Sequence, residues 1–318
     1  MKPFLLELLI CPACLPQEQP LRPQDLEARQ GDIVSGQLIC PNCSRGYPIR
    51  EGVALLTPDR QPDSRATSKY ETPAVLSSYL WSHYGDLLSD SEASDAYQEW
   101  ADLVQPNRGL ALDIGAAVGR FTFELGRKSQ GAIGIDNSHA FVRAARQLLL
   151  TGQIQIDLAV EGRLSCKKSL SLPHHWPRER IDFIVGDALA LPFRRGTFSV
   201  LASLNVLDKL PKPLQHLTEL NRVAHPRHTQ LLCSDPFSWS TEIAEEQDWL
   251  GGTDRGRYAG RGIDHLGALL QGRDQHLLPP WQIEDQGHVW WKIRTHANHF
   301  ELIRSCYIKA NRSSPAGD

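Results

Sequence analysis

One pattern constrains the fold of this chain more than any other: an apolar segment ends in an acid and continues into a glycine-spaced turn. Residues 110–119 read Leu-Ala-Leu-Asp-Ile-Gly-Ala-Ala-Val-Gly, and a second apolar segment ends on Asp136. In α/β proteins, glycines let the backbone approach a nucleotide, and an acid at the next strand end accepts hydrogen bonds from ribose hydroxyls. The pattern therefore predicts a nucleotide-type site at the carboxyl ends of parallel strands.

The rest of the second half of the chain alternates between strand-like and helix-like segments. We expect strands at 109–114, 131–136, 181–185, 198–203 and 230–234, helices at 118–128 and 138–150, and a closing antiparallel pair at 289–293 and 302–309. Such alternation is typical of a doubly wound α/β sheet that binds its ligand at the carboxyl ends of the strands.

The spacing Asp113-x-Gly115-x-x-x-Gly119, without a phosphate-binding lysine, resembles the S-adenosylmethionine (SAM) methyltransferases. The resemblance implies the class I fold, a Rossmann-like seven-stranded sheet, and SAM as methyl donor. It assigns cofactor contacts to Asp113, Gly115, Gly119, Asp136, Asp187, Ala188 and Asn205. Singly, each acid could be a turn or cap residue, but three acids in this order favour SAM binding. Ala117 departs from the pattern, because many relatives have glycine there.

In these roles, Gly115 and Gly119 permit close approach of the amino-acid portion of SAM, and Asp113 supports the turn or the ligand's ammonium. Asp136 accepts hydrogen bonds from the ribose hydroxyls. Asp187, with the backbone of Ala188, reads the adenine edge.

Four of the seven cysteines form two Cys-Pro-x-Cys pairs, namely Cys11, Cys14, Cys40 and Cys43. Two such pairs complete a closed tetrahedral site, which predicts structural zinc; the alternative is a degenerate ribbon without metal. The other three cysteines are scattered. Paired cysteines in a chain of this length favour metal binding in a reducing compartment over a disulfide framework, so we expect a cytoplasmic protein.

Around these cysteines, residues 4–58 resemble the small zinc-ribbon activators of tRNA and translation-factor methyltransferases, through Tyr-Pro-Ile at 47–49 and the Gly-Val and Leu-Leu-x-Pro that follow. The predicted organisation is a zinc ribbon at 1–58, a linker and helices forming a possible lid at 59–100, a methyltransferase domain at 101–310 and a flexible tail at 311–318.

Acceptor contacts are expected from two segments. Polar residues Asn205 and Asp208 follow the fourth strand, which in this class of enzyme ends beside the sulfonium. A helix over 73–84 carries Tyr79 and His83 at helical spacing, and such an aromatic helix could equally be core packing.

Several motifs together resemble the C-terminal methyltransferase domain of ovothiol synthase, a 5-thiohistidine N-methyltransferase. They are Tyr-Glu-Thr at 70–72, His-Tyr-Gly at 83–85 and Trp-Leu-Gly-Gly at 249–252. The resemblance implies a thiohistidine-like or selenium-containing small molecule as methyl acceptor. Methylation of a ring nitrogen releases a proton, and our hypothesis is that Asp208, Tyr79 or His83 accepts it, with Tyr84, Trp239 and Trp249 around the substrate. The iron-dependent sulfur-inserting domain is absent, so this chain cannot make the carbon–sulfur bond.

The alternative function is a methyltransferase of rRNA, tRNA or protein that docks its substrate through the zinc ribbon and the basic segment 163–180. That segment is otherwise a solvated insertion. A net charge of −3 gives no electrostatic argument for nucleic acid. A non-enzymatic activating subunit is a third reading. No apolar run approaches the roughly 20 residues that span a membrane, and the oligomeric state is left open.

Overall fold

The computed structural model describes residues 1–58, 68–273 and 275–312. All but Ser68 of the predicted linker segment 59–68 and all but residues 311 and 312 of the predicted tail therefore lie outside the described residues. The strands are β1 (Arg22–Arg29), β2 (Asp32–Ile39), β3 (Gly46–Arg50), β4 (Val53–Leu56), β5 (Leu110–Ile114), β6 (Gly131–Asp136), β7 (Gln153–Glu161), β8 (Leu164–Ser171), β9 (Ile181–Gly186), β10 (Phe198–Leu204), β11 (Thr229–Asp235), β12 (Gln282–His296) and β13 (His299–Arg312). The helices are α1 (Pro73–Tyr84), α2 (Ala96–Leu103), α3 (Arg120–Lys128), α4 (His139–Thr151), α5 (Pro213–Val223) and α6 (Gly262–Leu270).

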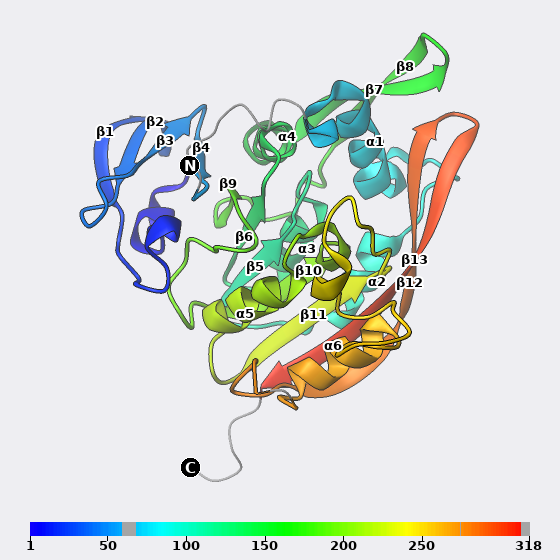
Figure 1. Ribbon diagram of the computed structural model, residues 1–318. Coiled ribbons are helices and arrows are strands. Elements are labelled where there is room, and N and C mark those ends of the chain that lie inside the picture. Colours follow the sequence, from blue (N-terminus) through cyan, green and yellow to red (C-terminus); the bar gives the residue numbers. More distant parts are fainter. Residues whose placement is uncertain (59–67, 274, 313–318) are drawn as a thin grey trace.

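One sheet of 11 strands runs through the molecule in the order β1-β2-β3-β4-β9-β6-β5-β10-β11-β13-β12 (Figure 1). From β9 to β11 the neighbours are parallel, and β13 and β12 close the sheet in antiparallel fashion. The section from β9 to β12 is the predicted Rossmann-like, doubly wound sheet, so the predicted α/β fold class is confirmed.

The N-terminal module continues this sheet instead of standing apart. Its last strand, β4, pairs in parallel with β9, so that Leu55 lies opposite Val185 and Leu56 opposite Gly186. A further backbone hydrogen bond joins Ile10 N to Pro192 O at 3.0 Å. The module thus covers the edge strand of the sheet, which would otherwise expose unpaired backbone groups.

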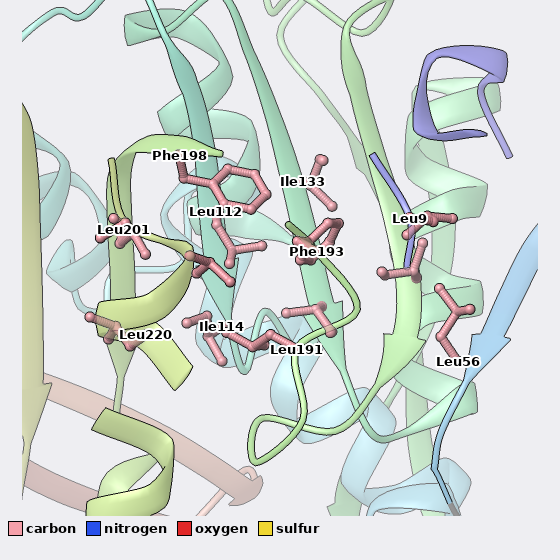
Figure 2. Close-up of a cluster of buried hydrophobic side chains, with 14 of the residues drawn as sticks. Leu9, Leu56, Leu112, Ile114, Ile133, Leu191, Phe193, Phe198, Leu201 and Leu220 are labelled. Carbon is pink, nitrogen blue, oxygen red and sulfur yellow. The ribbon is translucent and has the colours of Figure 1, made fainter. Parts of the chain in front are cut away.

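The two faces of the sheet bury different clusters, because successive residues of a strand point to opposite faces. In β5, Leu112 and Ile114 belong to one cluster and Ala111 to the other. The cluster of Leu112 also holds Leu9 and Leu56 from the N-terminal module (Figure 2). The module and the large domain therefore share one hydrophobic core.

A separate hairpin of β7 and β8 projects beside the tip of the β12–β13 hairpin (Figure 1). Ile154, Ile156 and Leu158 alternate as buried residues in β7, whereas β8 exposes nearly every side chain. The predicted insertion is thus a regular hairpin whose basic residues Lys167 and Lys168 face solvent. The period-two alternation in β7 is a strand signal that we had not assigned.

Among the described residues, no helix is both long and apolar enough to cross a bilayer.

Candidate active site

A cavity of about 560 Å³ lies where the carboxyl ends of the central strands meet α1 and the β12–β13 hairpin. One half is formed by residues at the ends of β5, β6, β9 and β10, and we call it the strand-end half. The other half is formed largely by aromatic residues of α1, α2, α4 and β12, namely Tyr79, His83, Tyr97, Phe141 and Trp291, and we call it the aromatic half.

In the strand-end half, Asp136 ties two chain segments together. Its carboxylate accepts hydrogen bonds from Ala117 N at 2.9 Å and from Ser138 N at 2.8 Å. Burial raises the pKa of Asp136 to about 6. The carboxylate therefore already fixes the turn after β5 to the end of β6, in the place where the sequence predicts a ribose contact.

Asp113 also lies in this wall, and its carboxylate accepts a hydrogen bond from Thr122 Oγ1 at 2.7 Å. Burial raises its pKa to about 7. Gly115 has φ of +76°, and a Cβ there would lie 2.2 Å from Val206 Cγ2, so only glycine fits. Both predicted residues therefore line the cavity, and their contacts with SAM stay predictions.

Ala117 and Gly119, two other residues of the glycine turn, differ in whether they line the cavity. Ala117 lines the cavity with φ of +45°, a conformation that usually favours glycine. Gly119 is absent from the lining; a Cβ there would lie 2.7 Å from the Phe183 ring. Close packing of α3 on the sheet explains this glycine, and its predicted contact with SAM stays a prediction that the cavity does not support.

Asp187 and Ala188 line the cavity after β9, as predicted. Asp187 accepts a hydrogen bond from Leu189 N at 2.8 Å, which shapes the turn. His216 of α5 is not among the residues predicted from the sequence. Its Nδ1 lies 3.2 Å from Ala188 O, and its Nε2 lies 2.9 Å from Ser203 Oγ. Burial lowers the pKa of His216 to about 4, so it stays neutral and holds this loop against β10.

Asn205 is in the wall at the end of β10, with φ of +58°. Its backbone N donates to Ser234 O at 2.6 Å, and its Oδ1 accepts from Ser305 Oγ at 2.6 Å. These bonds to β11 and β13 hold a left-handed residue in place at the predicted site.

The aromatic half contains two predicted residues, Tyr79 and His83, and three that sequence analysis missed. The Tyr79 ring lies 4.7 Å from that of Phe141 and 5.8 Å from that of His83, between ring centroids. Tyr97 Oη is 2.7 Å from His83 Nε2, and the Trp291 ring meets His83 edge-on at 6.3 Å. Burial, reinforced by the Arg120 guanidinium, holds the pKa of His83 well below its usual range.

Helix α1 is fixed over the aromatic half by hydroxyl groups. Ser78 Oγ donates to Arg294 O at 2.6 Å, and Ser82 Oγ donates to Lys292 O at 2.7 Å, both in β12. At the start of the helix, Thr72 Oγ1 accepts from Val75 N at 3.4 Å.

The Tyr-Glu-Thr motif before α1 has a second anchor, on α4. The Glu71 carboxylate accepts from His139 N at 2.9 Å and from Ala140 N at 3.0 Å. A carboxylate at a helix N-terminus satisfies backbone donors that have no partner within the helix. The motif thus joins the segment before α1 to the start of α4.

Besides Gly119, four predicted site residues lie outside the cavity lining. Asp208 is buried, accepting from Ser238 N at 2.7 Å and lying 3.1 Å from Lys209 Nζ. Tyr84 is fully buried and donates its hydroxyl to Val118 O at 2.9 Å. Trp239 and Trp249 stack on each other with centroids 6.3 Å apart. Their catalytic and substrate roles stay predictions that the cavity does not support.

The four predicted metal ligands, Cys11, Cys14, Cys40 and Cys43, come together in the N-terminal module. Their sulfur atoms all lie within 4.8 Å of one another, and the pairs Cys11–Cys43 and Cys14–Cys40 are both 3.7 Å apart. All four are free thiols, and a tetrahedral zinc ion with Zn–S bonds of about 2.3 Å separates its sulfurs by about 3.8 Å. The cluster therefore fits structural zinc.

Polar groups around the cluster support the same interpretation. Tyr47 Oη lies 3.2 Å from Cys11 Sγ, and Asn42 Nδ2 donates to Cys14 Sγ at 3.5 Å. Donors of this kind stabilise the charge on thiolate ligands.

Comparison with known proteins divides the chain in the same way. Residues 2–52 match the family of Trm112p-like proteins, and residues 112–229 match the family described as methyltransferase domain. No curated protein matches the chain.

Solved structures with similar folds include a SAM-dependent methyltransferase from Methanosarcina mazei, 19% identical, which aligns over 70% of this chain and 100% of its own with a TM-score of 0.46. A SAM-dependent methyltransferase from Aquifex aeolicus is 14% identical over 75% of this chain and 97% of its own, with a TM-score of 0.43. A chain from the complex of the Haloferax volcanii Trm112 methyltransferase activator with a methyltransferase is 13% identical over 77% of this chain and 98% of its own, with a TM-score of 0.44.

The family matches agree with the sheet order and with the acids at the strand ends. The chain carries a SAM-dependent methyltransferase domain, preceded by a Trm112p-like region with a four-cysteine cluster.

Proposed function

We propose that this protein is an N-methyltransferase that transfers the methyl group of SAM to an imidazole nitrogen of a thiohistidine-like small molecule or its selenium counterpart. The observation that carries the proposal is the continuity of the cavity. The strand-end carboxylates and the aromatic half belong to one space of about 560 Å³. A methyl donor and a small planar acceptor can therefore lie beside each other.

The dimensions of the cavity support a small acceptor. Pockets for small molecules are typically about 300–1,000 Å³ and lined by apolar and aromatic side chains with a few polar groups. The aromatic half fits this description, and α1 lies over it, fixed by Ser78 and Ser82. A heteroaromatic ring fills such a space by stacking and edge contacts with Tyr79 and Phe141.

In this proposal the strand-end half holds the methyl donor. Asp136 accepts from the ribose hydroxyls, Asp187 and the backbone of Ala188 meet the adenine, and Gly115 lets the amino-acid portion approach the turn. SAM, when bound, supplies a sulfonium methyl group that an unprotonated ring nitrogen takes, while the S–CH₃ electron pair returns to sulfur and the acceptor loses one proton overall. The chain aligns the methyl group of the donor with the acceptor nitrogen.

Two of the three predicted proton acceptors remain in contact with the acceptor space. Tyr79 has a raised pKa because of burial, so its phenol stays protonated and donates. His83 stays neutral because burial lowers its pKa. A neutral imidazole accepts a proton or donates a hydrogen bond depending on which nitrogen carries the hydrogen.

Mass spectrometry tests the proposal directly. The zinc-loaded protein is incubated with SAM and 5-thiohistidine, its selenium analogue, histidine or bulk RNA, with Asp136→Ala as the SAM-binding control. We expect one methyl group on the thio- or selenoimidazole and much less on histidine. Methylation of RNA with none on any imidazole would contradict the proposal.

One feature of the structure favours methylation of RNA. The β7–β8 hairpin exposes Arg163, Lys167 and Lys168, as a docking element for an RNA phosphate backbone would. The RNA arm of the experiment therefore decides between the two functions.

A further inference from the structure

Two nitrogen atoms in the side chains of the aromatic half have no hydrogen-bond partner among the residues that the structure describes. They are Nδ1 of His83 and Nε1 of Trp291, whose side chains belong to residues only 4% and 5% exposed. Both residues line the cavity. Buried polar atoms without a partner are rare in folded proteins, so two of them on one small chamber point to a ligand that completes their hydrogen bonds.

The hydrogen bond to Tyr97 determines which His83 nitrogen carries the hydrogen. Tyr97 is 7% exposed, and within residues 1–58, 68–273 and 275–312 its Oη bonds to no atom except His83 Nε2, at 2.7 Å. If Nε2 carried the hydrogen, both the Tyr97 hydroxyl hydrogen and Nδ1 would be unpaired. If Tyr97 donates to Nε2, only one N–H is unpaired. The second arrangement leaves fewer buried polar groups unsatisfied, so Nδ1 carries the hydrogen.

Trp291 contributes the same kind of group. An indole nitrogen is a donor only, so its unpaired atom is also an N–H. The rings of His83 and Trp291 meet at 83° with centroids 6.3 Å apart, and both residues line the cavity. The side chains of two lining residues therefore carry N–H donors that have no acceptor in the part of the chain that the structure describes.

We propose that His83 Nδ1–H and Trp291 Nε1–H together bind the thiolate or selenolate of a five-membered heteroaromatic acceptor. The inference rests on the proposed function and deepens it by naming the residues that recognise the heteroatom. A single anionic atom can accept from both donors, and charge-assisted hydrogen bonds are the stronger kind. The surrounding rings of Tyr79 and Phe141 suit a large, polarizable sulfur or selenium atom.

Other anions fit this wall less well. A carboxylate in a protein usually meets an arginine or lysine. Both lysines of the lining, Lys69 and Lys209, are exposed, and Arg120 is occupied by Asp86 and Glu124. Histidine has no sulfur or selenium on its ring, so it would leave both N–H groups unpaired. Sites built to bond a substrate group reject analogues that lack that group. In this assignment His83 donates a hydrogen bond, and the ring proton of the acceptor leaves to solvent instead of to His83.

The test compares 5-thiohistidine with 5-(methylthio)histidine, which has no thiolate. Trp291→Phe removes the N–H and keeps the aromatic ring, and Trp290→Phe, on the next residue and 47% exposed, is the matched control. We expect Trp291→Phe to reduce the kcat/KM preference for the thiol over the methylthio compound by about 10- to 100-fold, with unchanged preference in the control. An equal loss for both substrates would show a packing role only and overturn the inference.

Variants of His83 give an independent measurement. His83→Asn keeps an amide donor near the position of Nδ1, whereas His83→Phe has none. We expect the asparagine variant to retain more of the preference for the thiol than the phenylalanine variant does. Equal loss in both would contradict a donor role for His83.

Calorimetric binding of 5-thiohistidine to the complex with S-adenosylhomocysteine separates the inference from the proposed function. Binding that weakens in Trp291→Phe without any methyl transfer would leave the inference standing and refute the proposed function. If methyl transfer occurs and Trp291→Phe leaves the substrate preference unchanged, the inference is refuted and the proposed function stands. Absence of binding would refute both.

Discussion

In the strand-end half of the cavity, Asp136, Asp113 and Asn205 have hydrogen-bond partners in the protein, whereas two polar atoms of the aromatic half have none within residues 1–58, 68–273 and 275–312. Asp136, Asp113 and Asn205 each accept hydrogen bonds from neighbouring chain segments. His83 Nδ1 and Trp291 Nε1 have no such bond. The difference indicates that bonds within the protein organise the strand-end half. Under the proposal above, the acceptor completes the polar groups of the aromatic half.

Loss of zinc should destabilise the strand-end half more than the aromatic half. The reason is that β4 of the N-terminal module pairs with β9, which ends at Gly186, directly before Asp187. Structural zinc sites supply about 10 kcal/mol or more of folding free energy. We expect Cys14→Ser to lose bound zinc and hydrogen-exchange protection in β4 and β9, with α1 less affected. Metal analysis and exchange mass spectrometry measure this, with Cys166→Ser as control. Equal loss of protection in α1 would show that the halves are not independent.

Asp136→Ala should remove SAM binding without changing the aromatic half. The substitution removes the ribose acceptor and leaves Ala117 N and Ser138 N without their partner. Each hydrogen bond to a charged group is worth about 1.5–3 kcal/mol, so the Kd for SAM should rise at least about 100-fold. Calorimetry measures this, with the exposed Asp157→Ala as control. A Kd within threefold of the wild type would remove Asp136 from the site.

The double substitution Ser78→Ala and Ser82→Ala should loosen the aromatic half alone. It removes both hydroxyl bonds between α1 and the backbone of β12, each worth about 1 kcal/mol. We expect the KM for the acceptor to rise about tenfold and the Kd for SAM to stay within twofold. Ser77→Ala, on the same helix, is the control. A similar rise in the Kd for SAM would contradict the division of the cavity into two independent halves.

How much of each half could be predicted from sequence follows from how it is built. An acid at or next to the end of an apolar strand is a local signal, and Asp113, Asp136 and Asp187, which the sequence singles out in this way, lie in the wall. Tyr97 and Trp291 belong to α2 and β12, which only the tertiary structure brings to α1. No local pattern marks them.

The aromatic residues that the sequence did single out after the fifth strand illustrate the same limit. Trp239 and Trp249 lie in a glycine-rich segment typical of a binding loop, but they stack on each other outside the cavity. Composition identifies aromatic residues without distinguishing a ring that packs from one that binds. The alternation in β7 was available and was not assigned, whereas the register of β4 on β9 depends on contacts that sequence periodicity does not encode.

Lowering the pH should weaken SAM binding through Asp136. Its pKa is raised to about 6 by burial, so the carboxylate is present above that pH and is lost as the pH falls through it. If the ionised form binds ribose, the Kd should be about tenfold higher at pH 5 than at pH 7, because one proton changes affinity by at most tenfold per pH unit. Asp113, with a pKa of about 7, titrates nearby. Asp136→Asn should flatten the profile, and a profile that keeps its slope would assign the effect to Asp113.

The smallest expected effect on SAM affinity is that of the Ala117→Gly substitution. This variant tests how the strand-end half is organised. Ala117 has φ of +45°, and its N–H bond to Asp136 holds this backbone shape against the preference of an alanine. Left-handed residues other than glycine cost about 1–3 kcal/mol, so glycine relieves strain in the folded state. It also gives the unfolded chain more freedom, which costs about 0.4–1 kcal/mol. The difference between these two terms is a rise of about 0 to 2.6 kcal/mol in the free energy of unfolding, measured by urea titration. We expect the Kd for SAM to be equal or slightly lower. A weaker affinity would mean that the methyl group of Ala117 itself contacts the ligand, and that the strained backbone is retained for that contact.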